Sequence, residues 1–245
     1  MHSHTFSMDA IATIRSCYSQ RFGIPRQPGL VTSAVAAIEF EPTTDNELAL
    51  RDLSAFSHLW VVFVFHAQHY TRFKPLVQPP RLGGKATMGV YATRSPNRRN
   101  PIGLSVVALR EVTFDKDRIR VLVDGGDFLD GTPVLDIKPY VSFVDAIPEA
   151  RCDWATPLPS GLEVTWNTEA LERLKKIQPD NNVVASGSLG LKHLIEQTLA
   201  QDPRPAHERG KDGKSGQYWG VMVGPADVRF KVEGGVVVIV AVETH

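Results

Sequence analysis

Residues 57–66 read SHLWVVFVFH and form the clearest strand pattern in the chain. Valine and aromatic residues dominate this run, and both residue types favour β-strands. Alternation along a strand places one set of side chains on one face (His58, Trp60, Val62, Val64 and His66) and the other set on the opposite face (Ser57, Leu59, Val61, Phe63 and Phe65). Both faces are largely apolar, which indicates a central strand or a strand of a barrel.

The segments around this strand are also β-type. We predict further strands at residues 10–16, 29–40, 89–94, 103–113, 118–124 and 130–138, with one or two helical turns at 46–54. Parallel βαβ units need amphipathic helices of about 10 to 15 residues between their strands, and none is evident before Tyr140. The sequence therefore predicts a single-sheeted antiparallel β-barrel, closed or nearly closed.

A smaller unit follows a proline-rich linker at residues 148–161. Helical spacing appears at residues 168–177, with Thr168 as the expected N-cap, and again at 189–200. Strands are expected at residues 218–223, 228–232 and 236–242, with Glu233-Gly234-Gly235 as a hairpin turn. We expect a mainly β protein with two domains: the barrel over residues 1–155 and an α+β C-terminal domain over residues 156–245.

Composition narrows the class of protein. The 245 residues are 42% hydrophobic and 22% charged, close to the averages of soluble globular proteins. Two cysteines, Cys17 and Cys152, cannot make a disulfide framework or a four-ligand zinc site, and we expect no metal. The longest apolar run, Leu59–Phe65, is far shorter than the ~20 residues of a membrane span. The N-terminus lacks the pattern of a signal peptide, so we expect a cytoplasmic protein.

Charge is segregated along the chain although 27 basic residues balance 27 acidic ones. Residues 53–110 contain no aspartate or glutamate and eight positive charges: Arg72, Lys74, Arg81, Lys85, Arg94, Arg98, Arg99 and Arg110. A local positive potential attracts phosphates even when the whole molecule is neutral. This segment predicts a nucleic-acid partner; the alternative is an exposed basic loop without one.

Common catalytic motifs are absent, including the P-loop, the nucleophile elbow and the zinc-protease helix. The run VLVDGGD at residues 121–127 resembles the start of a nucleotide-binding glycine turn. Its glycine motif is incomplete, and Thr132-Pro133 prevents an immediate helix, so a Rossmann fold is rejected. Three polar loops, at residues 25–28, 92–96 and 130–133, could instead converge on a pocket for a nucleoside or an amino acid. Considered alone, residues 130–133 also fit an ordinary turn.

Seven ordered blocks carry a family resemblance: PRQPGL (25–30), FSHLW (56–60), PPRLGG (79–84), ATRSP (92–96), NPIG (100–103), DGTPVLDIKPY (130–140) and QDPRPA (201–206). In this order they resemble the TsaA-like family over nearly the whole chain. The resemblance implies a β-barrel methyltransferase that uses S-adenosylmethionine. Its implied substrate is tRNA bearing N6-threonylcarbamoyladenosine at position 37, beside the anticodon, and its implied state is a homodimer.

The same resemblance implies the site residues. The cofactor pocket would draw on Arg26, Gln27, Phe65, His66, Arg94, Leu104, Asp130, Gly131, Thr132 and Pro133. Transfer of the sulfonium methyl requires alignment of the reactants and no covalent protein intermediate. A group that removes the proton of the acceptor nitrogen would help, and Asp202 is the candidate, although it equally fits a turn at the end of a helix. Contacts to tRNA are expected from Arg72, Lys74, Arg81, Lys85, Arg98, Arg99 and Arg204.

Two other classes of function stay open from the sequence. The chain could be a non-catalytic module that binds an adenosyl ligand or RNA. It could also be a scaffold dimer without a small ligand. Titration with S-adenosylmethionine, followed by an assay for methyl transfer, separates these classes from the enzyme.

Overall fold

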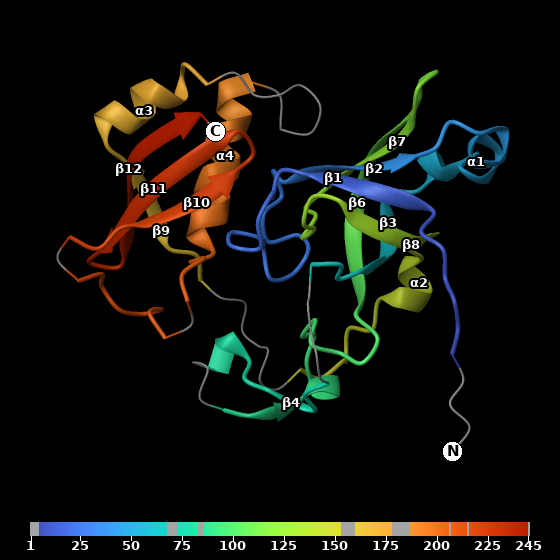
Figure 1. Cartoon of the computed structure of the whole chain (residues 1–245), viewed down its shortest axis with the longest axis horizontal. Coiled ribbons are helices and arrows are strands. Elements are labelled where there is room, and N and C mark those ends of the chain that lie inside the picture. Colours follow the sequence, from blue (N-terminus) through green and yellow to red (C-terminus); the bar gives the residue numbers. More distant parts are fainter. Residues whose placement is uncertain are drawn as a thin grey trace.

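The first half of the protein is a closed barrel of six strands, shown at the right of Figure 1 in a computed structural model. The structure describes residues 5–67, 73–82, 86–152, 160–177, 187–205, 207–214 and 216–244. In order around the barrel, the strands are β1 (Ala12–Ser16), β2 (Val35–Phe40), β7 (Ile119–Asp124), β6 (Ile102–Phe114), β3 (His58–Val64) and β8 (Thr132–Pro139). All six pairings are antiparallel, and pairing of Ala12 with Val134 closes the ring. The predicted mainly β fold with a single-sheeted barrel is confirmed.

The strand at residues 57–66 behaves as its alternation predicts. In β3, Leu59, Val61 and Phe63 point into the barrel and are at most 3% exposed. Trp60 and Val62 lie on the outer face and are partly exposed. The barrel interior is filled by apolar side chains from all six strands. Burial of this apolar surface is the main stabilising contribution to the barrel.

Short elements connect the barrel strands. These are α1 (Thr44–Ala49), η1 (Leu53–Ala55), the paired β4 (Leu76–Val77) and β5 (Met88–Gly89), η2 (Pro80–Leu82), η3 (Val90–Ala92) and α2 (Ser142–Asp145). Two strand predictions were wrong in part. Residues 90–92 form a 3₁₀ turn, because Thr93 N–H and its hydroxyl both donate to Val90 O. Residues 29–34 form turns, with Gly29 at φ +78°, so β2 begins only at Val35.

The C-terminal part is a four-stranded sheet with two helices on it, seen at the left of Figure 1. Its elements are β9 (Glu163–Trp166), α3 (Thr168–Leu174), α4 (Gly187–Ala200), β10 (Trp219–Val223), β11 (Ala226–Glu233) and β12 (Val236–Thr244). The strand order is β10-β11-β12-β9, and β9 runs parallel to β12. The expected hairpin at Gly234-Gly235 is confirmed, with both glycines at positive φ. The α+β character is confirmed as well.

Two details of this part differ from expectation. The N-cap of α3 is Asn167 rather than Thr168, because the Asn167 side chain accepts from Ala170 N at 2.7 Å. Strand β9 was not anticipated, since it is a run of only four residues next to the proline-rich linker. The predicted boundary between residues 155 and 156 lies outside the described residues, and the division into two domains stays a prediction.

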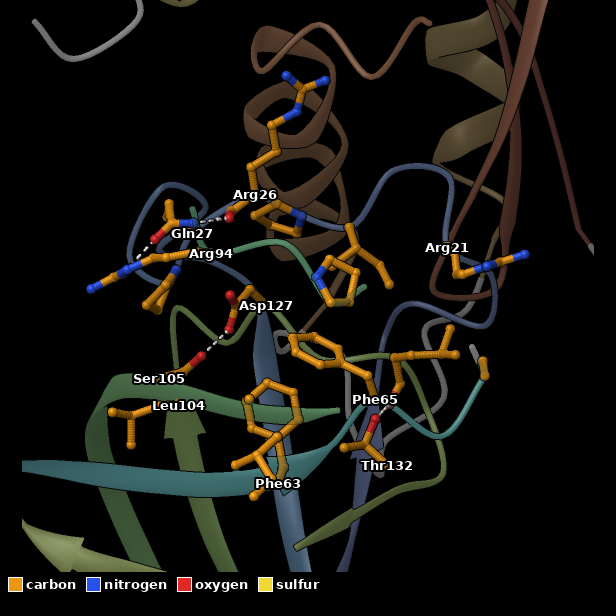
Figure 2. Close-up of a pocket in the computed structure, with 18 of the residues that line it drawn as sticks. Arg21, Arg26, Gln27, Phe63, Phe65, Arg94, Leu104, Ser105, Asp127 and Thr132 are labelled. Atoms are coloured by element: carbon orange, nitrogen blue, oxygen red, sulfur yellow. Dashed lines mark hydrogen bonds between the residues drawn. The ribbon is translucent and has the colours of Figure 1, made fainter. Parts of the chain in front are cut away.

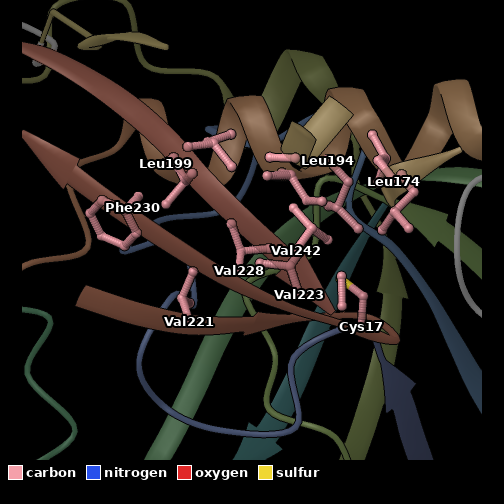
Figure 3. Packing of buried hydrophobic residues seen from close by; sticks show 14 of the residues in the cluster. Cys17, Leu174, Leu194, Leu199, Val221, Val223, Val228, Phe230 and Val242 are labelled. Carbon is pink, nitrogen blue, oxygen red and sulfur yellow. The ribbon is translucent and has the colours of Figure 1, made fainter. Parts of the chain in front are cut away.

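One loop of the N-terminal part is packed into the core of the C-terminal sheet. Cys17, Tyr18, Val31 and Ala34 are all at most 4% exposed and belong to the same buried cluster as the side chains of α4, β10, β11 and β12 (Figure 3). The Tyr18 hydroxyl lies 3.2 Å from Thr198 Oγ1 on α4. Residues 17–34, which we call the shared loop, therefore connect β1 to β2 and also complete the C-terminal core.

The described residues contain neither a membrane-spanning helix nor a cluster of metal ligands. No helix among them combines the length and the apolar character needed to cross a membrane. No group of three or more histidine, cysteine, aspartate or glutamate side chains in the described part of the chain is arranged to hold a metal ion.

Candidate functional site

A cavity of about 500 Å³ lies at the end of the barrel where β3 ends and where β6 and β8 begin (Figure 2). This volume falls in the range of small-molecule sites, ~300–1,000 Å³. Its walls come from three parts of the chain: residues 21–28 of the shared loop, the loop at 93–98, and the strand ends with the turn at 127–132. Loops far apart in the sequence meet here because the barrel brings neighbouring strand ends to one rim.

Aromatic rings form the floor of the cavity. Phe63 packs edge-on against Phe65 and Phe128, with ring centroids 5.1 Å apart in both pairs. Gly103 lies under this cluster, where an added Cβ would be 2.2 Å from Phe63 Cζ. The position therefore requires glycine for Phe63 to keep its place. The result is a rigid apolar surface suited to a flat ring.

Asp127 is the acidic group of the cavity. Ser105 Oγ donates a hydrogen bond of 2.7 Å to Asp127 Oδ1, and both residues line the cavity (Figure 2). Burial raises the pKa of Asp127 from 3.8 to about 6, although the bond from Ser105 and the positive charge of Arg94 act in the opposite direction. Among the described residues, no lysine or arginine forms an ion pair with Asp127. A carboxyl group in this setting is matched to a cationic ligand.

Cationic and amide groups lie at the solvent-exposed mouth of the cavity. Arg94 Nη1 donates to Gln27 Oε1, and Gln27 Nε2 donates to Arg26 O. Desolvation lowers the pKa of Arg26, and the negative charge of Asp202 acts against this shift. The cavity thus has an apolar floor, one carboxyl group on its side, and guanidinium and amide groups at its mouth. A ligand with a flat ring, a cationic centre and a carboxylate would find a partner for each group.

Two family models together match most of the chain. Residues 13–146 match the model of the tRNA-methyltransferase O N-terminal domain, and residues 159–245 match that of the TrmO C-terminal domain. This chain belongs to the TrmO family. The resemblance drawn from the seven sequence blocks is thereby confirmed.

Several relatives of this TrmO family member cover nearly its full length. A tRNA (adenine(37)-N6)-methyltransferase of Escherichia coli strain K12 is 41% identical over 93% of this chain and 94% of that protein. A putative S-adenosylmethionine-dependent methyltransferase of Pseudomonas aeruginosa is 41% identical over 92% of both. The crystal structure of TrmO from P. aeruginosa superposes with a TM-score of 0.77 and 33% identity, covering 98% of this chain and 99% of that one.

The structure brings together most of the residues that were predicted to bind a cofactor. Those lining the cavity are Arg26, Gln27, Phe65, His66, Arg94, Leu104 and Thr132. Thr132 also links two parts of the site, because its hydroxyl donates to Leu129 O at 2.7 Å and lies 3.4 Å from His66 Nδ1. The convergence of the three polar loops, which the sequence could only suggest, is present in this TrmO fold.

Three predicted residues lie beside the cavity and do not line it. Asp130 accepts from Ser16 N at 2.9 Å, and Arg15 Nη1 is 3.7 Å from its other oxygen. Gly131 has φ +75°, and a Cβ added there would be 4.0 Å from His66 Nε2. Pro133 pairs with Thr13 in the barrel sheet. These contacts hold the turn between β7 and β8 in shape, and a direct cofactor contact by these residues stays a prediction.

Sequence reasoning missed part of the TrmO cavity. Phe63, Ser105 and Asp127 line it, as does Arg21. Asp127 belongs to the glycine run at 121–127 that was set aside with the Rossmann fold. A signal for it was available, because it follows a strand and lies only three residues before the polar turn at 130–133. Ser105 alternates with apolar residues in β6, and nothing in its sequence context marks it.

The predicted basic residues lie in different surroundings. Arg98 lines the cavity, and Arg99 lies over the ring of Phe73 with its guanidinium carbon 5.1 Å from the ring centroid. Lys74 and Arg81 are exposed. Arg72 and Lys85 lie outside the described residues.

The Asp202-Pro203-Arg204 segment follows α4. Arg204 is 2% exposed, and its Nε and Nη2 donate to the two oxygens of Asp202 at 2.7 and 2.9 Å. Its guanidinium also donates to Lys211 O at 2.9 Å and lies over the Trp219 ring. Contact of Arg204 with RNA stays a prediction, and it would require this buried arrangement to open. The negative charge of Asp202 acts on the guanidinium group of Arg26 in the same chain. The segment after α4 and the shared loop therefore meet at the mouth of the cavity.

Proposed function

We propose that this protein transfers a methyl group from S-adenosylmethionine to N6 of adenosine 37 in tRNA, and that the adenosine carries a threonylcarbamoyl group. The observation that carries the proposal is the convergence of the predicted loops on one cavity in a TrmO fold. The names of full-length relatives support the reaction and the cofactor. The threonylcarbamoyl group rests on the family resemblance.

The cavity residues fit the cofactor. S-adenosylmethionine has an adenine ring, two cationic centres and a carboxylate. The rings of Phe63 and Phe65 would pack against its apolar parts, and Arg94 with Gln27 would bind its carboxylate. Asp127, a half-buried carboxyl group that makes no ion pair among the described residues, would bind the ammonium or the sulfonium. Arg26, His66, Leu104 and Thr132 complete the wall, and Asp130, Gly131 and Pro133 hold the adjoining turn.

The bound cofactor supplies a methyl group already activated on sulfur. The chain then has to hold the acceptor nitrogen in line with this group and to keep water out. The proton on the nitrogen must also leave, and we propose Asp202 as its acceptor. Arg204 holds both oxygens of Asp202, and Arg26 connects this carboxylate to the cavity mouth. Asp202→Asn should therefore lower kcat and leave the Kd for S-adenosylmethionine unchanged.

Calorimetric titration and a transfer assay test the proposal together. Saturable binding of S-adenosylmethionine and S-adenosylhomocysteine is expected, followed by methylation of tRNA that bears threonylcarbamoyladenosine. Binding without turnover would support the non-catalytic module instead. Mass spectrometry of anticodon-loop nucleosides, from cells with and without the gene, tests the same reaction in vivo. The methylated nucleoside should be missing in the deletion.

Basic residues of the segment 53–110 support tRNA binding. Lys74, Arg81, Arg98 and Arg99, together with Arg72 and Lys85, would neutralise phosphates, so affinity should fall steeply with salt. Arg81→Glu should weaken tRNA binding and reduce this salt dependence, with no effect on cofactor binding. Lys138→Glu is the matched control, because Lys138 is an exposed cation near the far end of β8. Equal losses in the two variants would contradict the assignment.

We further propose a homodimer that works in the cytoplasm, where its tRNA substrate is found. The outer face of the barrel supports the dimer, because apolar cross-strand pairs (Trp60 with Val106, Val62 with Leu104, and Val64 with Ile102) follow one another along β3 and β6. Leu104 is 54% exposed within this patch. Val62→Asp should turn the dimer into a monomer in light scattering. The two domains, 1–155 and 156–245, belong to the same proposal.

A further inference from the structure

Four flat groups form a row next to the cavity, in which Tyr91 and Arg99 are exposed and Phe73 and Arg98 are half-buried. The guanidinium carbon of Arg98 is 5.4 Å from the centroid of the Tyr91 ring, and the Tyr91 centroid is 6.4 Å from that of Phe73, with 30° between the ring planes. Arg99 lies over the other ring, 5.1 Å from the Phe73 centroid. The row therefore consists of two neighbouring aromatic rings with a guanidinium group at each end, and we call Arg98, Tyr91, Phe73 and Arg99 the stacking row.

The backbone holds Tyr91 outward in a fixed place. Its neighbour Val90 is 1% exposed, and Val90 N–H donates to Pro75 O at 2.8 Å. The carbonyl of Val90 accepts from Thr93 N–H and from the Thr93 hydroxyl. This tight turn buries Val90 and leaves the Tyr91 side chain 68% exposed. A large aromatic ring on a rigid turn offers contact area at little cost in conformational entropy.

Arg98 connects the stacking row to the cavity. Its Nη1 donates to Thr93 O at 2.8 Å and to Val90 O at 3.3 Å, so the guanidinium is fixed beside the Tyr91 ring. The same arginine lines the cavity, as do Thr93 and Arg94. A ligand on Tyr91 would therefore lie directly beside a ligand in the cavity.

Charge selects the type of ligand. The row lies within residues 53–110, which contain no aspartate or glutamate. Aromatic rings flanked by guanidinium groups bind unpaired nucleobases by stacking and bind the attached phosphates by charge. A protein partner would need acidic side chains that also match two aromatic rings, whereas an unstacked RNA loop supplies both the flat groups and the negative charge.

We propose that Tyr91 stacks on an unpaired base of the anticodon loop adjacent to the nucleotide that is methylated, while Arg98 and Arg99 hold the phosphates of that base. This rests on the proposed function, because it needs tRNA as the substrate. The stacked neighbour keeps the target nucleotide splayed out of its own stack and directed into the cavity. Tyr91 is thus a substrate-positioning residue outside the cofactor site.

The test uses the full chain and a synthetic anticodon stem-loop RNA that carries threonylcarbamoyladenosine at position 37. Matched RNAs have an abasic nucleotide on one side or the other of that position, which removes a base and keeps its phosphate. Tyr91→Ala should weaken binding of the intact RNA about tenfold, as expected for the loss of one stacked base. Tyr91→Phe keeps the ring and should bind as the wild type does. Phe143→Ala, an exposed aromatic of α2 beyond the far end of β8, is the control and should have no effect.

A double-mutant comparison isolates the stacking contact. Wild-type protein should bind one of the abasic RNAs about tenfold more weakly, and Tyr91→Ala should cause no further loss on that RNA. The comparison of intact with abasic RNA on one protein does not depend on whether a substitution disturbs the fold. The Kd for S-adenosylmethionine should be equal in all variants.

Three results would overturn the proposal: unchanged RNA affinity in Tyr91→Ala, an equal loss on intact and abasic RNAs, or a change of oligomeric state that identifies Tyr91 as a contact between copies. Failure of the proposed function looks different, because wild-type protein would then not methylate the RNA at all. If the wild type methylates the RNA and Tyr91→Ala binds the RNA normally, the stacking proposal is refuted and the proposed function stands.

Discussion

The barrel and the C-terminal sheet are stabilised in different ways. The barrel closes on itself, and its buried cluster contains only residues from 12 to 134, with partly buried side chains up to Ile137. The C-terminal sheet is open, and α3 and α4 together with the shared loop complete its core (Figure 3). Leu194, Leu199 and Val221 pack in the same cluster as Tyr18, although each lies more than 170 residues from it in the chain.

This difference shows how the cavity depends on both parts. One side of the shared loop, Cys17, Tyr18, Val31 and Ala34, packs on the C-terminal core, and residues 21–28 of the same loop line the cavity. Gly23, which is part of this segment, has φ +98°, and a Cβ added there would be 2.6 Å from Val221 Cγ2 of β10. The barrel supplies the cavity floor without help, whereas the C-terminal core positions the wall that carries Arg26 and Gln27.

Replacement of Tyr18 should give the largest effect and tests this dependence directly. Tyr18→Ala removes a fully buried ring and its hydroxyl contact with Thr198, so the free energy of unfolding should fall by about 3–5 kcal/mol. Affinity for S-adenosylmethionine should fall too, because the loop loses its anchor. Phe40→Ala, at the barrel end away from the cavity, is the control and should cost stability without changing the affinity of the folded protein. Unchanged affinity in Tyr18→Ala, by calorimetry, would show that the loop holds its shape alone.

Replacement of Asp127 should raise the free energy of unfolding, whereas replacement of Tyr18 should lower it. Its folded pKa of about 6 is above the ordinary value of 3.8, so folding favours the protonated form and the carboxyl group reduces stability as pH rises through this interval. Asp127→Asn should therefore stabilise the protein by up to about 3 kcal/mol at pH 7, with little effect at pH 4. Thermal unfolding of both proteins across this pH range measures the difference.

The same substitution should weaken cofactor binding. If Asp127 binds a cationic centre, wild-type affinity for S-adenosylmethionine increases as pH rises through about 6, and the asparagine variant loses this dependence. S-adenosylhomocysteine has the ammonium and lacks the sulfonium. Loss of the pH dependence for both ligands identifies the ammonium as the partner, and loss for S-adenosylmethionine alone identifies the sulfonium. A flat pH profile in the wild type would remove Asp127 from the binding site.

A smaller effect is expected at the cavity floor. Gly103→Ala places a methyl group 2.2 Å from the Phe63 ring, which must move. Overpacking of this kind costs about 1–3 kcal/mol. Because Phe63 supports Phe65 and Phe128, cofactor affinity should fall together with stability. A crystal structure of the variant with Phe63 unmoved would contradict this account.

The smallest effect is expected at the N-terminus of α3, a helix that packs against β12. Asn167→Ala removes the N-cap of α3 and should cost about 1 kcal/mol. Cofactor affinity and methyl transfer should stay at the wild-type level. A loss of affinity here would mean that any weakening of the C-terminal unit reaches the cavity, and the contrast with Tyr18 would disappear.

Local patterns were enough to predict most of the barrel. Within residues 57–66, the run His58–Val64 forms β3, because valine and aromatic side chains favour a strand. The hairpin at Gly234-Gly235 forms because glycine readily adopts the positive φ of both turn positions. Prediction failed at residues 90–92, where hydrogen bonds to the Val90 carbonyl produce a turn in a sequence that has β propensity. In the site, residues of the polar loops were found, and Ser105 and Asp127 were missed. The role of each depends on the hydrogen bond between them, and this contact joins residues 22 positions apart in the sequence.

By itself, the sequence determined most of the strands, the two helices of the C-terminal part, the segregation of positive charge and the family, because these depend on residue type and short spacing. The tertiary structure alone decided that Asp127 faces the aromatic floor, that the shared loop belongs to the C-terminal core, and that Arg98 joins Tyr91 to the cavity. The physical reason is that burial, electrostatic shifts and close packing depend on distances between residues far apart in the chain. Those distances are set only when the barrel closes and the second core packs against its loop.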